Sequence, residues 1–144
     1  AGLMKTDLGL YALEFNTRMG DPETQSLIPR IEEDLVPILM AAASGKLKEH
    51  SISRSQEIAV HVVMSAKGYP GTNGQKIQTG DEITVQNLDQ STLMFTAGVS
   101  ESEGKLKTSG GRICGLTVLG KSLSEVHERI YRELPKVQFS GAHY

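Results

Sequence analysis

The feature that most constrains the fold is a run of mostly apolar residues at 58–65, followed at once by the turn-forming sequence Lys-Gly-Tyr-Pro-Gly at 67–71. Such a run is typical of a central strand that is covered on both faces. Glycines punctuate the residues that follow, and short apolar segments lie between them. These segments predict further strands at residues 76–78, 83–85, 93–98, 106–108 and 113–119. The second part of the chain is therefore predicted to be β-rich.

A helix is predicted near the end of this β-rich part, over residues 122–134. Ser122 and Glu125 have the spacing of a capping box, in which side chains satisfy the free N–H groups at a helix start. The apolar residues of the segment fall on one helical face: Leu123, Val126, Ile130 and Leu134. We expect this face to pack on the sheet, which places the chain in the α+β class.

Residues 10–15 also predict a strand, and polar residues follow it. Side chains two positions apart on a strand point to the same side, so Glu14 and Asn16 are expected to lie together. A carboxylate and an amide oxygen are ligands that Mg²⁺ selects, usually with nucleotide phosphates and waters beside them. Spacing alone leaves open a simpler interpretation, in which the two side chains form a solvated surface. Arg18 places a cation nearby that could bind an anion or form an exposed salt bridge.

Two helices are predicted between this strand and the β-rich part. Asp21 as N-cap and Pro22 at the first helical position predict a short helix over residues 22–28. A second helix is expected from its N-cap Asp34 to a terminating Gly45. Its apolar stripe consists of Leu35, Ile38, Leu39 and Ala42.

Composition narrows the classes of function. The 144 residues carry a formal net charge of -2, which provides no basic surface for nucleic acid or an anionic membrane, so small molecules are the expected partners. Cys114 is the single cysteine, which excludes an internal disulfide and a multi-cysteine zinc site, and inert packing is its expected role. No apolar run of membrane-spanning length and no export leader occur, so a cytoplasmic location is expected.

The polar residues 46–57 lack periodicity and predict a linker between two bodies. The first residues, 1–4, carry no start signal for an element, and the last, 137–144, stop after a strand pattern and a glycine turn. We therefore expect the chain to be a piece of a longer protein.

The four histidines are expected to have no part in chemistry. His61 lies inside the apolar run, where a hydrogen-bonded core residue is more usual than a ligand or base. His50, His127 and His143 have no carboxylate or second histidine at metal-binding spacing.

Four sequence elements, in this order and spacing, resemble the phosphoribosylamine-glycine ligase family, also called glycinamide ribonucleotide synthetases, of the ATP-grasp superfamily. They are Leu13-Glu14-Phe15-Asn16-x-Arg18-x-Gly20-Asp21-Pro22-Glu23, Ser65-Ala66-Lys67-Gly68-Tyr69-Pro70-Gly71, Ala97-Gly98 and Thr108-Ser109-Gly110-Gly111-Arg112. The resemblance implies two domains. Residues 1–46 are expected to be the C-terminal strand and helices of an ATP-grasp domain. Residues 47–144 are expected to be a small β-rich domain with a hybrid-motif-like sheet and a packed C-terminal helix, truncated at its end.

The resemblance also implies a reaction. In this family ATP phosphorylates the carboxylate of glycine, and the amine of 5-phosphoribosylamine attacks the glycyl phosphate to form glycinamide ribonucleotide in de novo purine biosynthesis. The missing N-terminal and ATP-binding domains would be the partners of this chain, and the 144-residue piece alone is expected to be inactive. The rival hypothesis is a non-catalytic binding or interaction module derived from an ATP-grasp protein.

The resemblance assigns roles to individual residues. Glu14 and Asn16 become ligands of Mg²⁺ or Mn²⁺, and Arg18 becomes a catalytic and substrate-binding cation. The remaining expected substrate-binding residues are Asp21, Gly110, Gly111 and Arg112, with the glycine loop at Gly68 and Gly71 facing the same site. Without the resemblance, Gly110-Gly111-Arg112 would be interpreted as an ordinary hairpin turn.

The chain departs from the family pattern near Ala97-Gly98. Thr96 stands where histidine is common, Val99 stands where threonine is common, and residues 101–103 form a more acidic loop. These departures leave the detailed contacts of that loop open.

Overall fold

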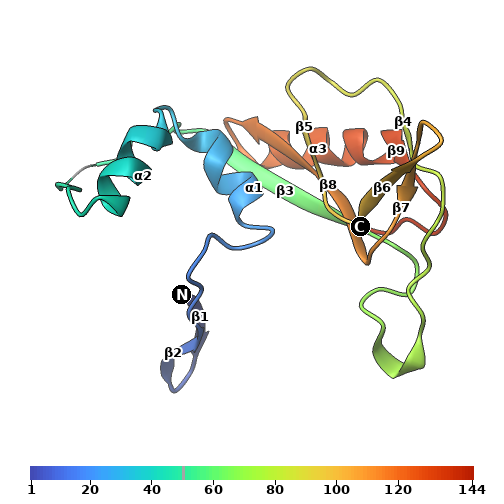
Figure 1. The fold of residues 1–144 in the computed structure, drawn as a ribbon, viewed down its shortest axis with the longest axis horizontal. Coiled ribbons are helices and arrows are strands. Elements are labelled where there is room, and N and C mark those ends of the chain that lie inside the picture. Colours follow the sequence, from blue (N-terminus) through green and yellow to red (C-terminus); the bar gives the residue numbers. More distant parts are fainter. Residues whose placement is uncertain (50) are drawn as a thin grey trace.

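The computed structural model describes residues 1–49 and 51–144, without the side chain of Asn73. A β-hairpin and short helices precede a β-rich body that carries the longest helix (Figure 1). The expected mixture of helices and small sheets is therefore confirmed. In these described ranges, no helix has the length and apolar character needed to cross a membrane. His50, which was expected to have no role, lies outside the described residues.

A three-stranded antiparallel sheet forms the centre of the β-rich body. β8 (Arg112–Gly120) lies between β3 (Ile58–Ser65) and β5 (Leu93–Thr96), and His61 of β3 lies opposite Thr117 of β8. The strand at 58–65 is confirmed, but its expected central position is wrong, because β8 is the middle strand. The apolar run in β3 has another cause: α3 contacts this strand, and so does α1.

Two shorter strand pairs complete the β-rich body. β6 (Val99–Ser102) pairs with β7 (Lys105–Thr108), and β4 (Thr84–Val85) pairs with β9 (Val137–Gln138). The expected strands at 83–85, 93–98, 106–108 and 113–119 correspond to β4, β5, β7 and β8, with small shifts at their ends. β6 was not expected, because its sequence, Val-Ser-Glu-Ser, is largely polar.

No strand forms at residues 76–78, so that prediction is wrong. The turn η2 (Thr72–Gly74) precedes this segment, and the backbone N–H of Gln78 donates to the carbonyl of Lys67 at 2.9 Å. The side chain of Ile77 lies close to Gly111. The segment is thus held by contacts with two other loops, at Lys67 and Gly111, and its one apolar side chain packs without a strand partner.

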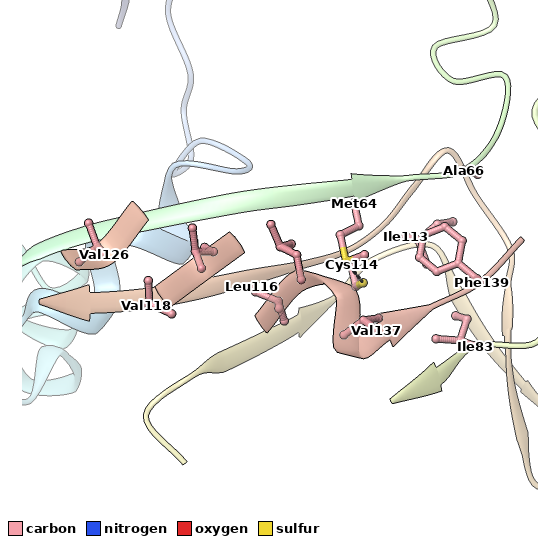
Figure 2. Close-up of a cluster of buried hydrophobic side chains, with 12 residues drawn as sticks. Met64, Ala66, Ile83, Ile113, Cys114, Leu116, Val118, Val126, Val137 and Phe139 are labelled. Carbon is pink, nitrogen blue, oxygen red and sulfur yellow. Dashed lines mark hydrogen bonds between the residues drawn. The ribbon is translucent and has the colours of Figure 1, made fainter. Parts of the chain in front are cut away.

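α3 (Leu123–Glu133) packs against β8 and β3 and begins where the sequence predicts. The hydroxyl of Ser122 accepts the backbone N–H of Glu125 at 3.2 Å, as in a capping box. Most of the predicted apolar face is buried, but Leu123 is 64% exposed and does not belong to it. The core between helix and strands consists of Met64, Ala66, Ile83, Ile113, Cys114, Leu116, Val118, Val126, Ile130, Leu134, Val137 and Phe139 (Figure 2).

β1 (Gly2–Thr6) and β2 (Gly9–Glu14) form an antiparallel hairpin apart from the β-rich body (Figure 1). The strand expected at 10–15 is confirmed with a shift of one residue at each end, whereas β1 was not anticipated. Every side chain of β2 is exposed, including Leu10 and Leu13. An isolated two-stranded hairpin gains little stability of its own.

The short helix α1 (Thr24–Leu27) starts later than expected and continues into the 3₁₀ turn η1 (Ile28–Arg30). Asp21 does not cap it, so the predicted N-cap is wrong. The reason is that the carboxylate of Asp21 accepts hydrogen bonds from Gln25 and Arg112 instead.

α2 (Leu35–Ala43) has the predicted cap, since the carboxylate of Asp34 accepts the backbone N–H of Val36 at 2.9 Å. No residue of α2 is buried, and Leu39 of the predicted apolar stripe is largely exposed. After it, the described parts of the predicted linker 46–57 form no helix or strand beyond an isolated bridge between Ile31 and Arg54.

Candidate functional site

Glu14 and Asn16 lie side by side, as the strand pattern predicts. The amide nitrogen of Asn16 donates to Oε1 of Glu14 at 3.0 Å, and both side chains are exposed. They line a cavity of about 350 Å³ together with Gly2, Arg18 and other residues of the turn that follows. Among the described residues, no group of three or more His, Cys, Asp or Glu side chains could hold a metal. This pair can therefore provide at most part of a metal's ligand shell.

A second cavity of about 530 Å³ lies on the other side of this turn. Arg18 and Asp21 line both cavities, and Arg112, Phe95 and Thr96 line only the second one. The structure thus brings Arg18, Asp21 and Arg112 together around one space, although β8 is far from the turn in sequence. A guanidinium pair beside a carboxylate suits a ligand that carries both an anionic group and an amine.

Arg112 makes two contacts with Asp21. Its Nη2 lies 2.9 Å from Oδ2 of the carboxylate, and its Nη1 donates to the backbone carbonyl of Asp21 at 3.1 Å. The second carboxylate oxygen accepts the side-chain amide of Gln25 at 2.9 Å. Arg18 donates to the adjacent carbonyl of Met19 at 2.8 Å. The two contacts of Arg112 join the turn to the β-rich body.

Gly110 and Gly111 line neither of these cavities. Gly110 packs against Gly98, where a Cβ on Gly98 would lie 2.8 Å from the Cα of Gly110. A Cβ on Gly111 would lie 2.4 Å from the ring of Tyr69. In the described contacts both glycines allow close packing beneath Arg112, and their predicted contact with substrate stays a prediction.

His61 is half-buried and hydrogen-bonded, as expected, and its partner is the hydroxyl of Thr117 at 2.8 Å. Burial lowers the pKa of His61, and the nearby carboxylate of Asp21 partly offsets this effect. Thr117 was not predicted to have a role, because a threonine in a strand is ordinary. Its partners lie far away in sequence, so no local signal could have revealed the pair.

Cys114 lies in the core, where burial raises the pKa of its thiol to about 11. The thiol is therefore protonated at neutral pH, in agreement with its expected inert role.

Residues 59–144 match the model of a protein family described as "Phosphoribosylglycinamide synthetase, C domain". The chain belongs to this family. The resemblance drawn from the four sequence elements is confirmed.

Relatives of this synthetase C-domain family match over the whole chain. It is 41% identical over 144 residues to the phosphoribosylamine–glycine ligase of Caldanaerobacter subterraneus subsp. tengcongensis, and 40% identical to that of Caulobacter vibrioides. In each case the match covers 100% of this chain and 34% of the relative. The crystal structure of the Thermotoga maritima phosphoribosylamine–glycine ligase superposes with a TM-score of 0.80 at 36% identity, over 99% of this chain and 34% of that one. The chain therefore spans about a third of the length of these relatives and is similar to their C-terminal portion.

Proposed function

We propose that this chain is the C-terminal portion of an ATP-dependent carbon–nitrogen ligase that joins glycine to 5-phosphoribosylamine through a glycyl phosphate. The observation that carries the proposal is the match over the whole chain to phosphoribosylamine–glycine ligases, together with the cluster of Glu14, Asn16 and Arg18 at one turn. The partners are ATP, glycine, 5-phosphoribosylamine and the remaining domains of the parent polypeptide. A cytoplasmic location belongs to the same proposal.

In this proposal residues 1–46 are the C-terminal part of an ATP-grasp domain, and residues 47–144 are the β-rich domain. Two features support the division. β2 carries apolar side chains on both faces yet is exposed throughout, which suits a strand of a larger sheet. α2 likewise has no buried residue. The substrates would meet where Asp21 contacts Arg112, between the two parts.

Glu14 and Asn16 fit a divalent cation of the Mg²⁺ or Mn²⁺ type. Adjacent ligands of an octahedral Mg²⁺ at about 2.1 Å lie roughly 3 Å apart, and the two side-chain atoms in contact are 3.0 Å apart. Rotation of the Asn16 amide would exchange its nitrogen for its oxygen and direct two oxygens at the cation. The bound metal would neutralise phosphate charge and orient the nucleotide.

The residues of the turn have separate tasks. Arg18 lines both cavities and holds the charge of the transferring phosphoryl group or of the ribose phosphate. Arg112 supplies a second cation to the larger cavity, and Asp21 orients it while leaving a carboxylate close to the place of the substrate amine. Gly110 and Gly111 complete the predicted substrate-binding loop. Alignment of the two substrates is the main contribution of these groups.

The test is made in the full-length parent enzyme with Glu14→Gln, which removes the charge at nearly constant size. We expect ATP- and glycine-dependent turnover to fall by more than a hundredfold and the Mg²⁺ concentration needed for half-maximal rate to rise. Glu101→Gln, on the exposed strand β6, is the matched control and should behave like the wild type. Near-normal turnover and metal dependence of the Glu14 variant would refute the metal assignment. A parent enzyme without ligase activity would refute the function.

A further inference from the structure

A closed circuit of hydrogen bonds joins β8 to the turn that carries Arg18 and Asp21. The hydroxyl of Thr117 donates to the backbone carbonyl of Gln25 at 2.9 Å, and the side-chain amide of Gln25 donates to Oδ1 of Asp21 at 2.9 Å. The other carboxylate oxygen of Asp21 accepts Nη2 of Arg112 at 2.9 Å. Both ends of the circuit, Thr117 and Arg112, lie on β8, so the middle strand of the sheet holds the turn at two points.

His61 fixes the hydroxyl of Thr117 in this arrangement. The hydroxyl has one hydrogen, which it donates to Gln25, so it must accept the N–H at Nδ1 of His61. Thr117 is fully buried, and this hydroxyl would be costly to leave unpaired. The imidazole lies directly over Gly115, where a Cβ would come within 2.3 Å of Nε2. The backbone of β8 thus makes room for the ring that orients Thr117.

Helix α1 depends on these polar contacts for its position. It is a single turn with no buried side chain and no side-chain cap, so apolar packing does little to orient it. On the opposite face of β8, α3 is held by buried apolar side chains such as Leu116 and Val118. On the α1 side, the buried Thr117 and His61 therefore provide hydrogen bonds that position α1, which a pair of valines could not provide.

We propose that Thr117 and His61 are positioning residues, which through Gln25 hold Asp21 and the turn with Arg18 in register with Arg112 across the larger cavity. This inference rests on the proposed function of that cavity. A displacement of the turn by about 1 Å would misalign both guanidinium groups relative to a shared ligand, and misplacement on this scale costs about a hundredfold in rate. Neither residue touches the substrate in this scheme.

The first experiment concerns the circuit alone and uses the 144-residue chain without ligand. Thr117→Val keeps the shape and removes the hydroxyl, and Thr117→Ser keeps the hydroxyl. We expect amide hydrogen exchange in α1 to accelerate roughly fivefold to tenfold in the Val variant, as for loss of one hydrogen bond, and to stay at the wild-type rate in the Ser variant. Thr108→Val is the matched control, because its buried hydroxyl accepts from Asp81 instead. Unchanged exchange in Thr117→Val would overturn the circuit.

The histidine is tested in the same chain. His61→Asn keeps a donor near the position of Nδ1, whereas His61→Leu removes it. The Leu variant should reproduce the exchange pattern of Thr117→Val, and the Asn variant should restore protection of α1. Equal exchange in the two variants would show that His61 only fills space, which would overturn its assignment.

The second experiment concerns the role in the reaction and uses the full-length parent enzyme. Thr117→Val should lower kcat/KM for the amine substrate by tenfold or more while KM for ATP stays unchanged, and Thr117→Ser should restore it. If Thr117→Val accelerates hydrogen exchange in α1 but leaves kcat/KM unchanged, the hydrogen-bond circuit would be supported and its positioning role in the reaction would be overturned. A parent without ligase activity would refute the proposed function and this role together, whereas the exchange result on the isolated chain would be unaffected.

Discussion

Replacement of Gly98 by alanine tests whether close backbone packing between Gly98 and Gly110 requires a residue without a Cβ at position 98. An added Cβ at Gly98 would lie 2.7 Å from the carbonyl oxygen of Arg112 and 2.8 and 2.9 Å from backbone atoms of Gly110. These neighbours are main-chain atoms, which cannot rotate away as a side chain could. Gly98 also accepts the N–H of Ser109 at 2.7 Å and donates to the carbonyl of Arg112 at 2.8 Å. The loop can therefore make room only by giving up bonds.

The cost follows from these contacts. Retreat of the loop would weaken two backbone hydrogen bonds worth about 1 kcal/mol each, and overpacking without retreat costs about 1–3 kcal/mol. We expect Gly98→Ala to lower the free energy of unfolding by about 2 kcal/mol. Gly110→Ala is the matched control from the same contact, because its Cβ would lie 3.1 Å from the Cα of Gly98 and 3.9 Å from the carbonyl oxygen of Arg112, so no atom comes within 3.0 Å. Alanine also lowers the conformational entropy of the unfolded chain, which stabilises the folded state by ~0.4–1 kcal/mol and offsets the closer contact. The free energy of unfolding of Gly110→Ala should therefore change little.

Urea unfolding of the 144-residue chain, followed by far-ultraviolet circular dichroism, measures both variants against the wild type. The chain contains no tryptophan, so dichroism is preferable to fluorescence. A Gly98→Ala variant within about 0.5 kcal/mol of the wild type would refute the packing argument. So would a Gly110→Ala variant that is destabilised as strongly as Gly98→Ala.

Three further predictions concern titration, the core and the thiol. Asp21→Asn removes a carboxylate that raises the pKa of His61, so the NMR titration midpoint of His61 should move down; an unchanged midpoint would contradict this. Ile130→Ala should lower the free energy of unfolding by about 2–5 kcal/mol because the side chain is fully buried, whereas Leu123→Ala on the same helix should cost less than about 0.5 kcal/mol. Cys114 should react with a disulfide reagent at pH 8 only after unfolding in urea, since burial raises its pKa to about 11; rapid reaction of the native chain would disprove this.

Local sequence patterns predicted those elements whose cause is local. The capping residues Ser122 and Asp34 mark the starts of α3 and α2 because a cap is satisfied within one turn. The spacing of Glu14 and Asn16 predicted their contact for the same reason. The apolar, strand-like sequence around Cys114 also assigned it correctly to the packed interior.

The features that sequence patterns missed depend on partners far along the chain. Asp21 is a residue type that commonly caps helices, yet its carboxylate binds Arg112 instead. Arg112 is 91 residues away in sequence, so no local pattern could predict this contact. Thr117 is ordinary until α1 lies over it and His61 lies beside it. β1 was missed because its sequence, Gly-Leu-Met-Lys-Thr, has neither an alternating pattern nor an apolar run like that of residues 10–15.

The open hairpin of β1 and β2 bears on how this sequence can change over evolutionary time. If both faces of the hairpin are exposed to water in the parent protein, neutral drift could replace Leu10 and Leu13 by polar residues without lowering the free energy of unfolding. Both side chains are more than half exposed in this structure. If other domains cover those faces, the same replacements would be eliminated by selection. The amino acids tolerated at these two positions in living organisms therefore record whether the hairpin spends its lifetime in solvent or inside a larger sheet.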